Sequence, residues 1–408
     1  MFLYIDPGTG SMLFTVLISV IGAAIYSLRM LLVKLRTKVG GKKRSGTDGR
    51  IPFVIFSDDK RYYSVFEPIL RILDERGCEV LYLTGSEDDP VLSASYAHVK
   101  AEYLSGNRLF ARLNFLSADV LLSTTPGLDV YQCKRSKQVR CYVHLPHAAS
   151  EIVLYRMFGI DYYDAILLSG EYQKKDVRDL EALRSLPAKE LTLVGIPYMD
   201  EMKKRLDSAP PVPAHERTVL LAPSWGKSAI FSVYGGKIID ALLATDMRVV
   251  IRPHPQSFKS ESELMERLMR EYPASERLEW NRDTDNFDVL RRSDILISDF
   301  SGVIFDFALV YDKPVIYTAP NFDVGQYDAW WLSRPLWTLS ALPRLGCELT
   351  EESMPRIAEL IEDCLADKSY AEGRKSVRRE TWAHMGKGAV RCADYLIAKQ
   401  KELTKEDT

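Results

Sequence analysis

The residues best suited to chemistry in this chain follow short apolar runs, at the points where these runs end in polar turns. One such run ends in Ser298-Asp299-Phe-Ser301-Gly302. The run is typical of a buried strand, and a helix is expected to begin at Ser301-Gly302. A helix start after a parallel strand presents backbone N–H groups to an anion such as phosphate, and Gly302 leaves room for an oxygen to approach the backbone. An ordinary strand-to-helix turn explains this single motif equally well.

Two further strand ends repeat the pattern. The strand Arg248–Ile251 runs into Arg252-Pro-His254-Pro, and the strand starting at Thr218 runs into Ser224-Trp225-Gly-Lys227. An arginine can pair with a phosphate, and a histidine can donate a hydrogen bond to one. Three such strand ends favour a phosphate-binding crevice over three unrelated turns. Asp306, on the helix after Gly302, either accepts a substrate hydroxyl in that crevice or caps a surface.

Two of the six histidines lie at another predicted strand end, in Val139-Arg-Cys-Tyr-Val-His144-Leu-Pro-His147. An imidazole that titrates near neutral pH is a natural general base for a hydroxyl proton. His147, at the mouth of the turn, is the preferred base, and His144 is the alternative. His144 is equally well explained as a buried strand histidine.

No metal site is expected in the chain. His144 and His147 have a spacing seen in metal pairs, but Pro146 disfavours the helix that would align them, and no third ligand is nearby. Asp283-Thr-Asp285 resembles a metal-binding Asp-x-Asp motif, yet it precedes a predicted helix, so capping explains it more simply.

Composition limits the class of protein. The chain has 408 residues, 46% of them apolar and 27% charged, with a net charge of -2. This length indicates two domains, and the charge balance argues against a nucleic-acid-binding protein. The six cysteines show no CxxC spacing and are expected to be reduced thiols in a cytoplasmic protein.

The N-terminal segment has a different character. An apolar stretch covers 12–28 and continues over 30–33, long enough to cross a bilayer, and a basic stretch follows up to Arg50. The positive-inside rule places that flank, and the body of the protein, on the cytoplasmic side of a cell membrane crossed once. An amphipathic or re-entrant helix on the inner leaflet is the alternative. In either case the protein is expected to contact the membrane.

Strand and helix patterns alternate along the remainder of the chain. This alternation predicts an α/β fold with two doubly wound, Rossmann-like domains that face each other across a cleft, which is the GT-B architecture. A proline-rich stretch, 208–216, separates the domains. The expected segments are a membrane anchor over 1–33, a basic linker over 34–50, an N-terminal domain over 51–207, a C-terminal domain over 217–370 and terminal helices over 371–408. The expected strands are 51–57, 78–84, 99–104, 118–124, 139–144, 164–169, 191–195, 218–223, 247–252, 277–280, 294–298 and 314–318.

Arg252-Pro-His254, Ser298-Asp299-Phe-Ser301-Gly-Val-Ile-Phe-Asp306 and the Ser224-Trp225 strand end together resemble the CDP-glycerol glycerophosphotransferase family, the teichoic-acid primases and polymerases. The resemblance covers most of 130–395 and is most specific in the second domain. It implies a transferase that moves glycerol phosphate from CDP-glycerol to a hydroxyl of a lipid-linked acceptor at the membrane and releases CMP. It implies no cofactor and no essential metal.

The resemblance also implies residue roles. The base would be His147 or His144, and His254 would stabilise the donor pyrophosphate. The turn from Ser298 to Ser301 would bind the same phosphates. Together with the strand-end patterns, this predicts that the donor phosphates and nucleotide are bound by Ser224, Trp225, Lys227, Arg252, Ser298, Asp299, Ser301, Gly302 and Asp306. Family members often carry serine at the position of Gly302, and the histidines here stand in a different local context from theirs.

Two other functions compete with this hypothesis. One is a GT-B glycosyltransferase or sugar-nucleotide epimerase that uses a nucleotide sugar in surface polysaccharide synthesis. The other is a membrane-anchored binding protein with a degenerate site. The sequence leaves open the acceptor, the polymer, the number of units added and the formation of a homo-oligomer.

Overall fold

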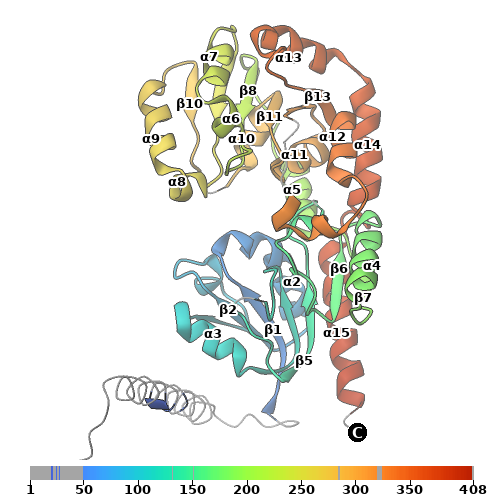
Figure 1. The fold of residues 1–408 in the computed structure, drawn as a ribbon. Coiled ribbons are helices and arrows are strands. Elements are labelled where there is room, and N and C mark those ends of the chain that lie inside the picture. The colour runs from blue at the N-terminus through green and yellow to red at the C-terminus, as the bar shows by residue number, and fades with distance from the viewer. Residues whose placement is uncertain are drawn as a thin grey trace, which may run out of the picture.

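The computed structural model describes residues 20–21, 24, 27, 49–130, 132–149, 151–283, 285–318 and 324–406. Within them the chain forms two parallel sheets, each covered by helices, which lie one above the other in Figure 1. We call the first sheet with its helices the first body, and the second sheet with its helices the second body. The predicted α/β class with two parallel sheets is confirmed.

The first sheet has seven parallel strands in the order β3-β2-β1-β4-β5-β6-β7. The strands are β1 (Ile51–Ser57), β2 (Val80–Thr84), β3 (Val99–Tyr103), β4 (Ser117–Ser123), β5 (Gln138–His144), β6 (Ala165–Leu168) and β7 (Glu190–Leu193). The α-helices between and after them are α2 (Tyr63–Glu75), α3 (Gly106–Asn114), α4 (Tyr172–Arg184) and α5 (Pro197–Ser208).

The second sheet has six parallel strands in the order β10-β9-β8-β11-β12-β13. The strands are β8 (Thr218–Leu221), β9 (Arg248–Ile251), β10 (Leu278–Trp280), β11 (Ile295–Ser298), β12 (Val315–Tyr317) and β13 (Gly346–Glu348). The helices that follow β8 in the chain are α6 (Ile230–Tyr234), α7 (Lys237–Leu243), α8 (Ser257–Ser260), α9 (Ser262–Glu271), α10 (Phe287–Arg292), α11 (Val303–Phe305), the π-helix η5 (Asp306–Val310), α12 (Trp337–Leu345), α13 (Ile357–Ala366), α14 (Ser369–Thr381) and α15 (Gly388–Lys405), of which α15 packs on the first sheet. The sequence prediction missed β13.

The strands are nearly continuous apolar runs because helices cover both faces of each sheet. In β1, Phe53 and Ile55 belong to one hydrophobic core, while Val54 and Phe56 belong to another. This alternation follows from the two-residue period of a strand, which directs successive side chains to opposite faces. Each sheet is therefore sandwiched between two cores, which holds the carboxyl ends of its strands in one rigid edge.

The strand order reverses direction once in each sheet. In the first sheet the reversal lies between β1 and β4, and in the second it lies between β8 and β11. Open parallel sheets bind ligands outside the carboxyl ends of the strands at such a point. The fold thus marks one ligand-binding position in each body.

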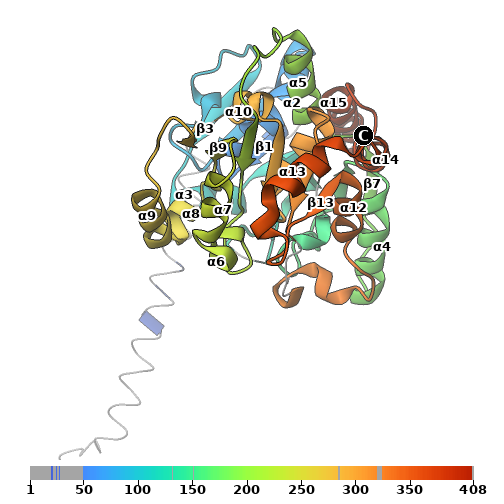
Figure 2. The ribbon, with the colours of Figure 1, turned by 90° about the horizontal axis from the view of Figure 1, so that it is seen from above.

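The last helices connect the two bodies. Figures 1 and 2 show α14 and α15 along one side of the molecule. Helix α14 packs on α12 in the second body, whereas α15 returns to the first body and packs on α2 and β4. Cys392, Ala393 and Leu396 of α15 are buried in the same core as Phe53. The segment predicted as separate terminal helices over 371–408 therefore contributes to both bodies, and the exact domain boundaries stay predictions.

The predicted membrane helix within 1–33 and the basic linker over 34–50 lie outside the described residues, except for Val20, Ile21, Ala24, Ser27 and 49–50. Among the described residues, no helix has both the length and the apolar character needed to span a bilayer. The membrane anchor stays a prediction.

Candidate active site between the two sheets

The three strand ends singled out in the second body are neighbours, since β9, β8 and β11 are adjacent in the sheet. The carboxylate of Asp299 is fully buried and accepts hydrogen bonds from the amides of Ser224 and Ile230, each at 3.1 Å. The hydroxyl of Ser298 donates to the carbonyl of Ala222 at 2.6 Å. These two side chains therefore tie the loop after β8 to the turn after β11. Binding of donor phosphate by Ser298 and Asp299 stays a prediction, and the contacts described give both a positioning role.

The loop after β8 presents different groups to a ligand. The side-chain hydroxyl of Ser224 is buried and has no hydrogen-bond partner among the described residues. Trp225 and Lys227 are exposed. Gly226, between them, has a φ of +97°, a conformation that glycine adopts readily, and its amide donates to Glu261 at 2.8 Å. This loop therefore offers a free hydroxyl, an indole and an ammonium group beside the β8 edge.

The turn after β11 contacts the first body. The helix predicted to begin at Ser301-Gly302 begins at Val303 and continues as the π-helix η5. A Cβ built on Gly302 would lie 3.5 Å from the Cβ of Ala148, which follows His147 in the chain. Ala149 is buried in the same core as Ile304. The β5 loop, which carries the candidate bases, therefore packs directly on the turn proposed to bind phosphate.

The two histidines of the β5 loop occupy different environments. His144 is fully buried, and its Nε2 lies 3.2 Å from the hydroxyl of Tyr155. His147 is half-buried, and its Nδ1 lies 3.1 Å from the Oγ1 of Thr124. Burial lowers the pKa of His144 to about 3, and burial together with the Arg61 charge lowers the pKa of His147 to about 4. Both rings are neutral near pH 7, and of the two only His147 is accessible to a ligand.

The Arg252-Pro-His254 turn follows β9. The Nδ1 of His254 accepts a hydrogen bond from the amide of Gln256 at 3.1 Å, so the proton of the neutral ring resides on Nε2. Burial and the Arg61 charge lower the pKa of His254 to about 4. The guanidinium of Arg252 donates to Asn281 after β10, and burial lowers its pKa. His254 is therefore a neutral N–H donor, and Arg252 is already held by a protein acceptor.

Asp306 lies in the π-helix and is buried. Its carboxylate accepts a hydrogen bond of 2.5 Å from the hydroxyl of Tyr198 on α5. Burial raises the pKa of Asp306 to about 6. The surface-cap alternative is wrong, because the carboxylate lies in the interior. Its role in donor binding stays a prediction.

Within the Asp-x-Asp sequence, only Asp285 bonds to the start of α10, and the N-cap residue of that helix is Asn286. Asp285 accepts a hydrogen bond of 2.9 Å from the amide of Phe287, the first residue of α10. Asp283 accepts from the side chain of Asn281 at 2.8 Å. Among the residues described, no three His, Cys, Asp or Glu side chains form a group suited to a metal ion. The expectation that no metal is essential stays untested.

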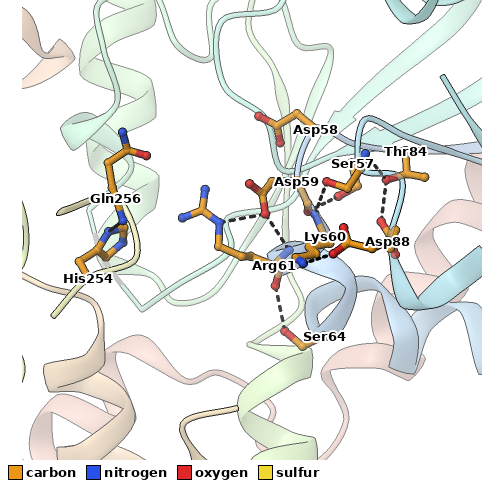
Figure 3. A network of polar contacts seen from close by, with 12 residues as sticks. Ser57, Asp58, Asp59, Lys60, Arg61, Ser64, Thr84, Asp88, His254 and Gln256 are labelled. Carbon is orange, nitrogen blue, oxygen red and sulfur yellow. Dashed lines mark hydrogen bonds and ion pairs between the residues drawn. The ribbon is translucent and has the colours of Figure 1, made fainter. Parts of the chain in front are cut away.

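The loop after β1 belongs to the same region, and the sequence prediction missed it. Asp58 accepts a hydrogen bond of 2.8 Å from the hydroxyl of Thr125, which joins the ends of β1 and β4 at the reversal point. The ring of Tyr62 lies 4.9 Å from that of His147. Figure 3 shows Arg61 of this loop extending toward the side where His254 lies. The polar run directly after 51–57 was the available signal, and it is the same signal used at the other strand ends.

Two neutral imidazoles, one from each body, lie within electrostatic range of a single guanidinium. The charge of Arg61 acts on both His147 and His254. A phosphate between the two bodies could receive hydrogen bonds from His254 and charge stabilisation from Arg61, and the neutral ring of His147 could accept a proton. Such an arrangement suits transfer of a phosphoryl group, which depends on positioning and charge stabilisation.

Solved structures with the same architecture include the wall teichoic acid polymerase TagF, with 15% identity, a TM-score of 0.54 and coverage of 86% of this chain and 89% of that chain. A TagF variant soaked with CDPG gives a TM-score of 0.56 at 15% identity and covers 93% and 98% of the two chains. The UDP-GlcNAc 2-epimerase of Methanocaldococcus jannaschii gives 0.58 at 12% identity, with 85% and 99% covered. At these identities the likeness establishes the fold alone, as GT-B-like.

No curated protein sequence matches the chain. The family model described as CDP-Glycerol:Poly(glycerophosphate) glycerophosphotransferase matches residues 163–385, more than half of the chain. This range includes every strand-end motif of the second body. The chain is therefore a transferase that belongs to the CDP-glycerol:poly(glycerophosphate) glycerophosphotransferase family.

Proposed function

We propose that this protein transfers glycerol phosphate from CDP-glycerol to a hydroxyl of a membrane-lipid-linked acceptor and releases CMP, as a step in synthesis of a teichoic-acid-like polymer. Membership of the family supports the donor and the transferred group. The observation that carries the proposal is that His147 and His254, from different bodies, both lie within electrostatic reach of Arg61. The donor pyrophosphate is the anion whose charge this region would accommodate.

In the proposed reaction, the acceptor hydroxyl oxygen attacks the phosphorus that carries the glycerol. A new P–O bond forms to the acceptor, and the bond from that phosphorus to the bridging oxygen breaks. The bridging oxygen leaves with the electron pair as part of CMP, and the hydroxyl proton passes to an imidazole. No redox change occurs, so no further reactant is needed.

His147 is the proposed base. A hydrogen bond to the backbone of Thr124 raises the pKa of His147, against the lowering by burial and Arg61. In the proposed tautomer Nδ1 carries the proton and donates it to Thr124, which leaves Nε2 free to receive one. The anionic donor would offset the Arg61 charge and raise the pKa of His147 when bound, which makes the ring a stronger base in the complex.

His254 is the proposed stabiliser of the leaving group. Its Nε2–H can donate to a pyrophosphate oxygen, and the fixed bond from Gln256 to Nδ1 holds the ring in that tautomer. Negative charge grows on the bridging oxygen in the transition state, so a positioned donor contributes more there than in the ground state. Trp225 and the Ser224 hydroxyl, beside this edge, are proposed to contact the nucleotide.

The proposed location is the cytoplasmic face of a cell membrane, with the protein held by one N-terminal helix. The apolar stretch over 12–28 and the basic residues after it support this location. A membrane position would also bring the enzyme to a lipid-linked acceptor.

The function is tested with the purified full-length protein, CDP-glycerol labelled in its glycerol, and membranes that contain acceptor. We expect CMP release and label in the lipid fraction, and neither product with UDP- or CDP-sugars. His147→Ala and His254→Ala should each lower kcat by about a hundredfold or more. Turnover of a UDP-sugar instead would favour the epimerase or glycosyltransferase alternative. Near-normal rates in both variants would refute the assigned roles.

A further inference from the structure

The loop after β1 holds an arginine, Arg61, whose amide and Nε donate hydrogen bonds to Asp59. Arg61 lies in the short 3₁₀ turn Lys60–Tyr62, and its side chain is 44% exposed. The Oδ1 of Asp59 accepts hydrogen bonds from both the amide and the Nε of Arg61, each at 2.9 Å. Within the described part of the chain, the two terminal Nη groups of Arg61 have no hydrogen-bond partner. Figure 3 shows these groups directed away from Asp59, toward the side of His254.

The neighbours of this loop come from both bodies. The ring of Tyr62 lies near both Arg61, whose Cζ is 5.7 Å from its centroid, and His147, whose ring is 4.9 Å away. Burial opposes ionisation of Asp59, but its hydrogen bonds to Arg61 lower its pKa, and the charge of Lys259 on α8 of the second body contributes in the same direction. The positive charge of Arg61 in turn acts on His254. Arg61 therefore projects between the two bodies.

We propose that Arg61 is a phosphate-binding residue of the active site, and that its two Nη groups hold the phosphate that is transferred to the acceptor. The inference rests on the proposed function and extends it to a residue outside 163–385, the range that the family model matches. A planar guanidinium with two parallel N–H groups matches two oxygens of one phosphate, and the Asp59 bond fixes its orientation beforehand.

The position of Arg61 favours contact with the phosphate that is transferred, rather than with the phosphate that leaves as part of CMP. The second body presents its own groups, including His254 and Ser224, to the nucleotide. Arg61 comes from the first body and stands beside Tyr62 and His147, where the acceptor hydroxyl must be deprotonated. In the proposed complex the phosphorus under attack would lie between these two sets of groups. Arg61 would therefore hold the non-bridging oxygens of the phosphorus that is transferred.

The charges around Arg61 agree with an anion at this position. Asp58 and Asp59 on its own loop act on it electrostatically, and Tyr62 flanks it. Asp59 already accepts hydrogen bonds from the Nε and the backbone amide of Arg61, and Asp58 accepts one from the hydroxyl of Thr125. Lys259 adds a second cation from the other body. The two Nη groups of Arg61, the charge of Lys259 and the neutral ring of His254 could therefore all interact with a phosphate.

The test compares Arg61→Ala with Lys60→Ala. Lys60 is the adjacent exposed cation, but its ammonium pairs with Asp88, so it serves as a matched control. We measure kcat/KM with CDP-glycerol and the Kd values of CDP-glycerol and CMP by titration calorimetry. Arg61→Ala should lower kcat/KM by about a hundredfold and weaken CDP-glycerol binding, while the Kd of CMP stays within about twofold. Lys60→Ala should behave as the wild type in all three measurements.

A pH profile supplies a readout that a purely structural role would not change. The Arg61 charge disfavours the protonated form of His147, so Arg61→Ala should raise the pKa of that imidazole. A base must be neutral to act, and the acidic limb of kcat/KM should therefore move to higher pH in Arg61→Ala. Arg61→Lys keeps the charge and should keep the limb in place, with lower activity because a lysine lacks the fork of donors.

Wild-type kinetics in Arg61→Ala would overturn the inference. A parallel loss of CMP affinity would also overturn it, since it would show general damage to the site. If the wild type does not use CDP-glycerol, the proposed function fails by itself. Arg61 is then judged by binding of inorganic pyrophosphate, where equal affinity of wild type and Arg61→Ala refutes the phosphate role.

Discussion

Asp306 gives the structure's most quantitative prediction. Its carboxylate is buried, and burial raises its pKa from 3.8 to about 6 even though the Tyr198 hydroxyl donates to it. The shift of about 2 units corresponds to about 3 kcal/mol, at 1.36 kcal/mol per unit. The folded state binds this proton more tightly than the unfolded state, so the stabilisation is complete below about pH 4 and is lost as the pH rises through about 6.

The perturbation is Asp306→Asn, which resembles the protonated acid and keeps an oxygen that can accept from Tyr198. At pH 7 the variant should unfold at a higher temperature than the wild type, by a few degrees for about 3 kcal/mol in a protein of this size. Near pH 4 the two proteins should unfold at the same temperature. If Asp306 also binds the donor as predicted, the more stable variant should lose activity toward CDP-glycerol.

The assay follows thermal unfolding by circular dichroism from pH 4 to pH 8. Asp246→Asn is the matched control, because Asp246 is an exposed carboxylate in the loop before β9. Its unfolding temperature should track the wild type at every pH. A difference in unfolding temperature between Asp306→Asn and wild type that does not vary with pH would refute the linkage argument. A wild type that is more stable than Asp306→Asn at pH 7 would also refute it.

Two further substitutions test how the site is built. Asp299→Ala removes the acceptor of several buried amide N–H groups and should lower the free energy of unfolding by about 3 kcal/mol or more, measured by urea denaturation. An effect below about 1 kcal/mol would show that the carboxylate does not hold the loop. Gly302→Ala places its Cβ at an ordinary 3.5 Å from Ala148 and should change stability by less than about 0.5 kcal/mol. Gly170→Ala places its Cβ 2.0 Å from the carbonyl oxygen of Glu380 and should be strongly destabilising, so equal melting temperatures for the two glycine variants would contradict the packing.

Much of the fold was predictable because it is encoded locally. The parallel strands are apolar runs bounded by polar turns, and the predicted strands lie within about two residues of the observed ones. The exception is β13, a three-residue strand with the sequence Gly-Cys-Glu. It has too few apolar residues for a recognisable pattern, and it is a strand only because β12 pairs with it.

The candidate site was predictable in part, for a related reason. Parallel strands place all their carboxyl ends on one edge, so polar residues after β8, β9 and β11 had to gather there once the sheet existed. The same reasoning applied to 51–57 would have found Asp58 and Arg61. This reasoning could not find the hydrogen bond from the amide of Ser224 to the carboxylate of Asp299, because the two residues are 75 positions apart.

The sequence by itself determined the class of fold, the residue types at the strand ends and the family to which they belong. These properties depend on short-range patterns, such as apolar runs, turn residues and motif spacing. The tertiary structure alone decided which polar groups bond to the protein itself, as Ser298 and Asp299 do, and which lack a partner among the described residues, as the Arg61 Nη groups do. It also decided that Ala148 meets Gly302 and that α15 returns to the first body. Such contacts depend on how two bodies are packed together, and no local pattern in the chain records that packing.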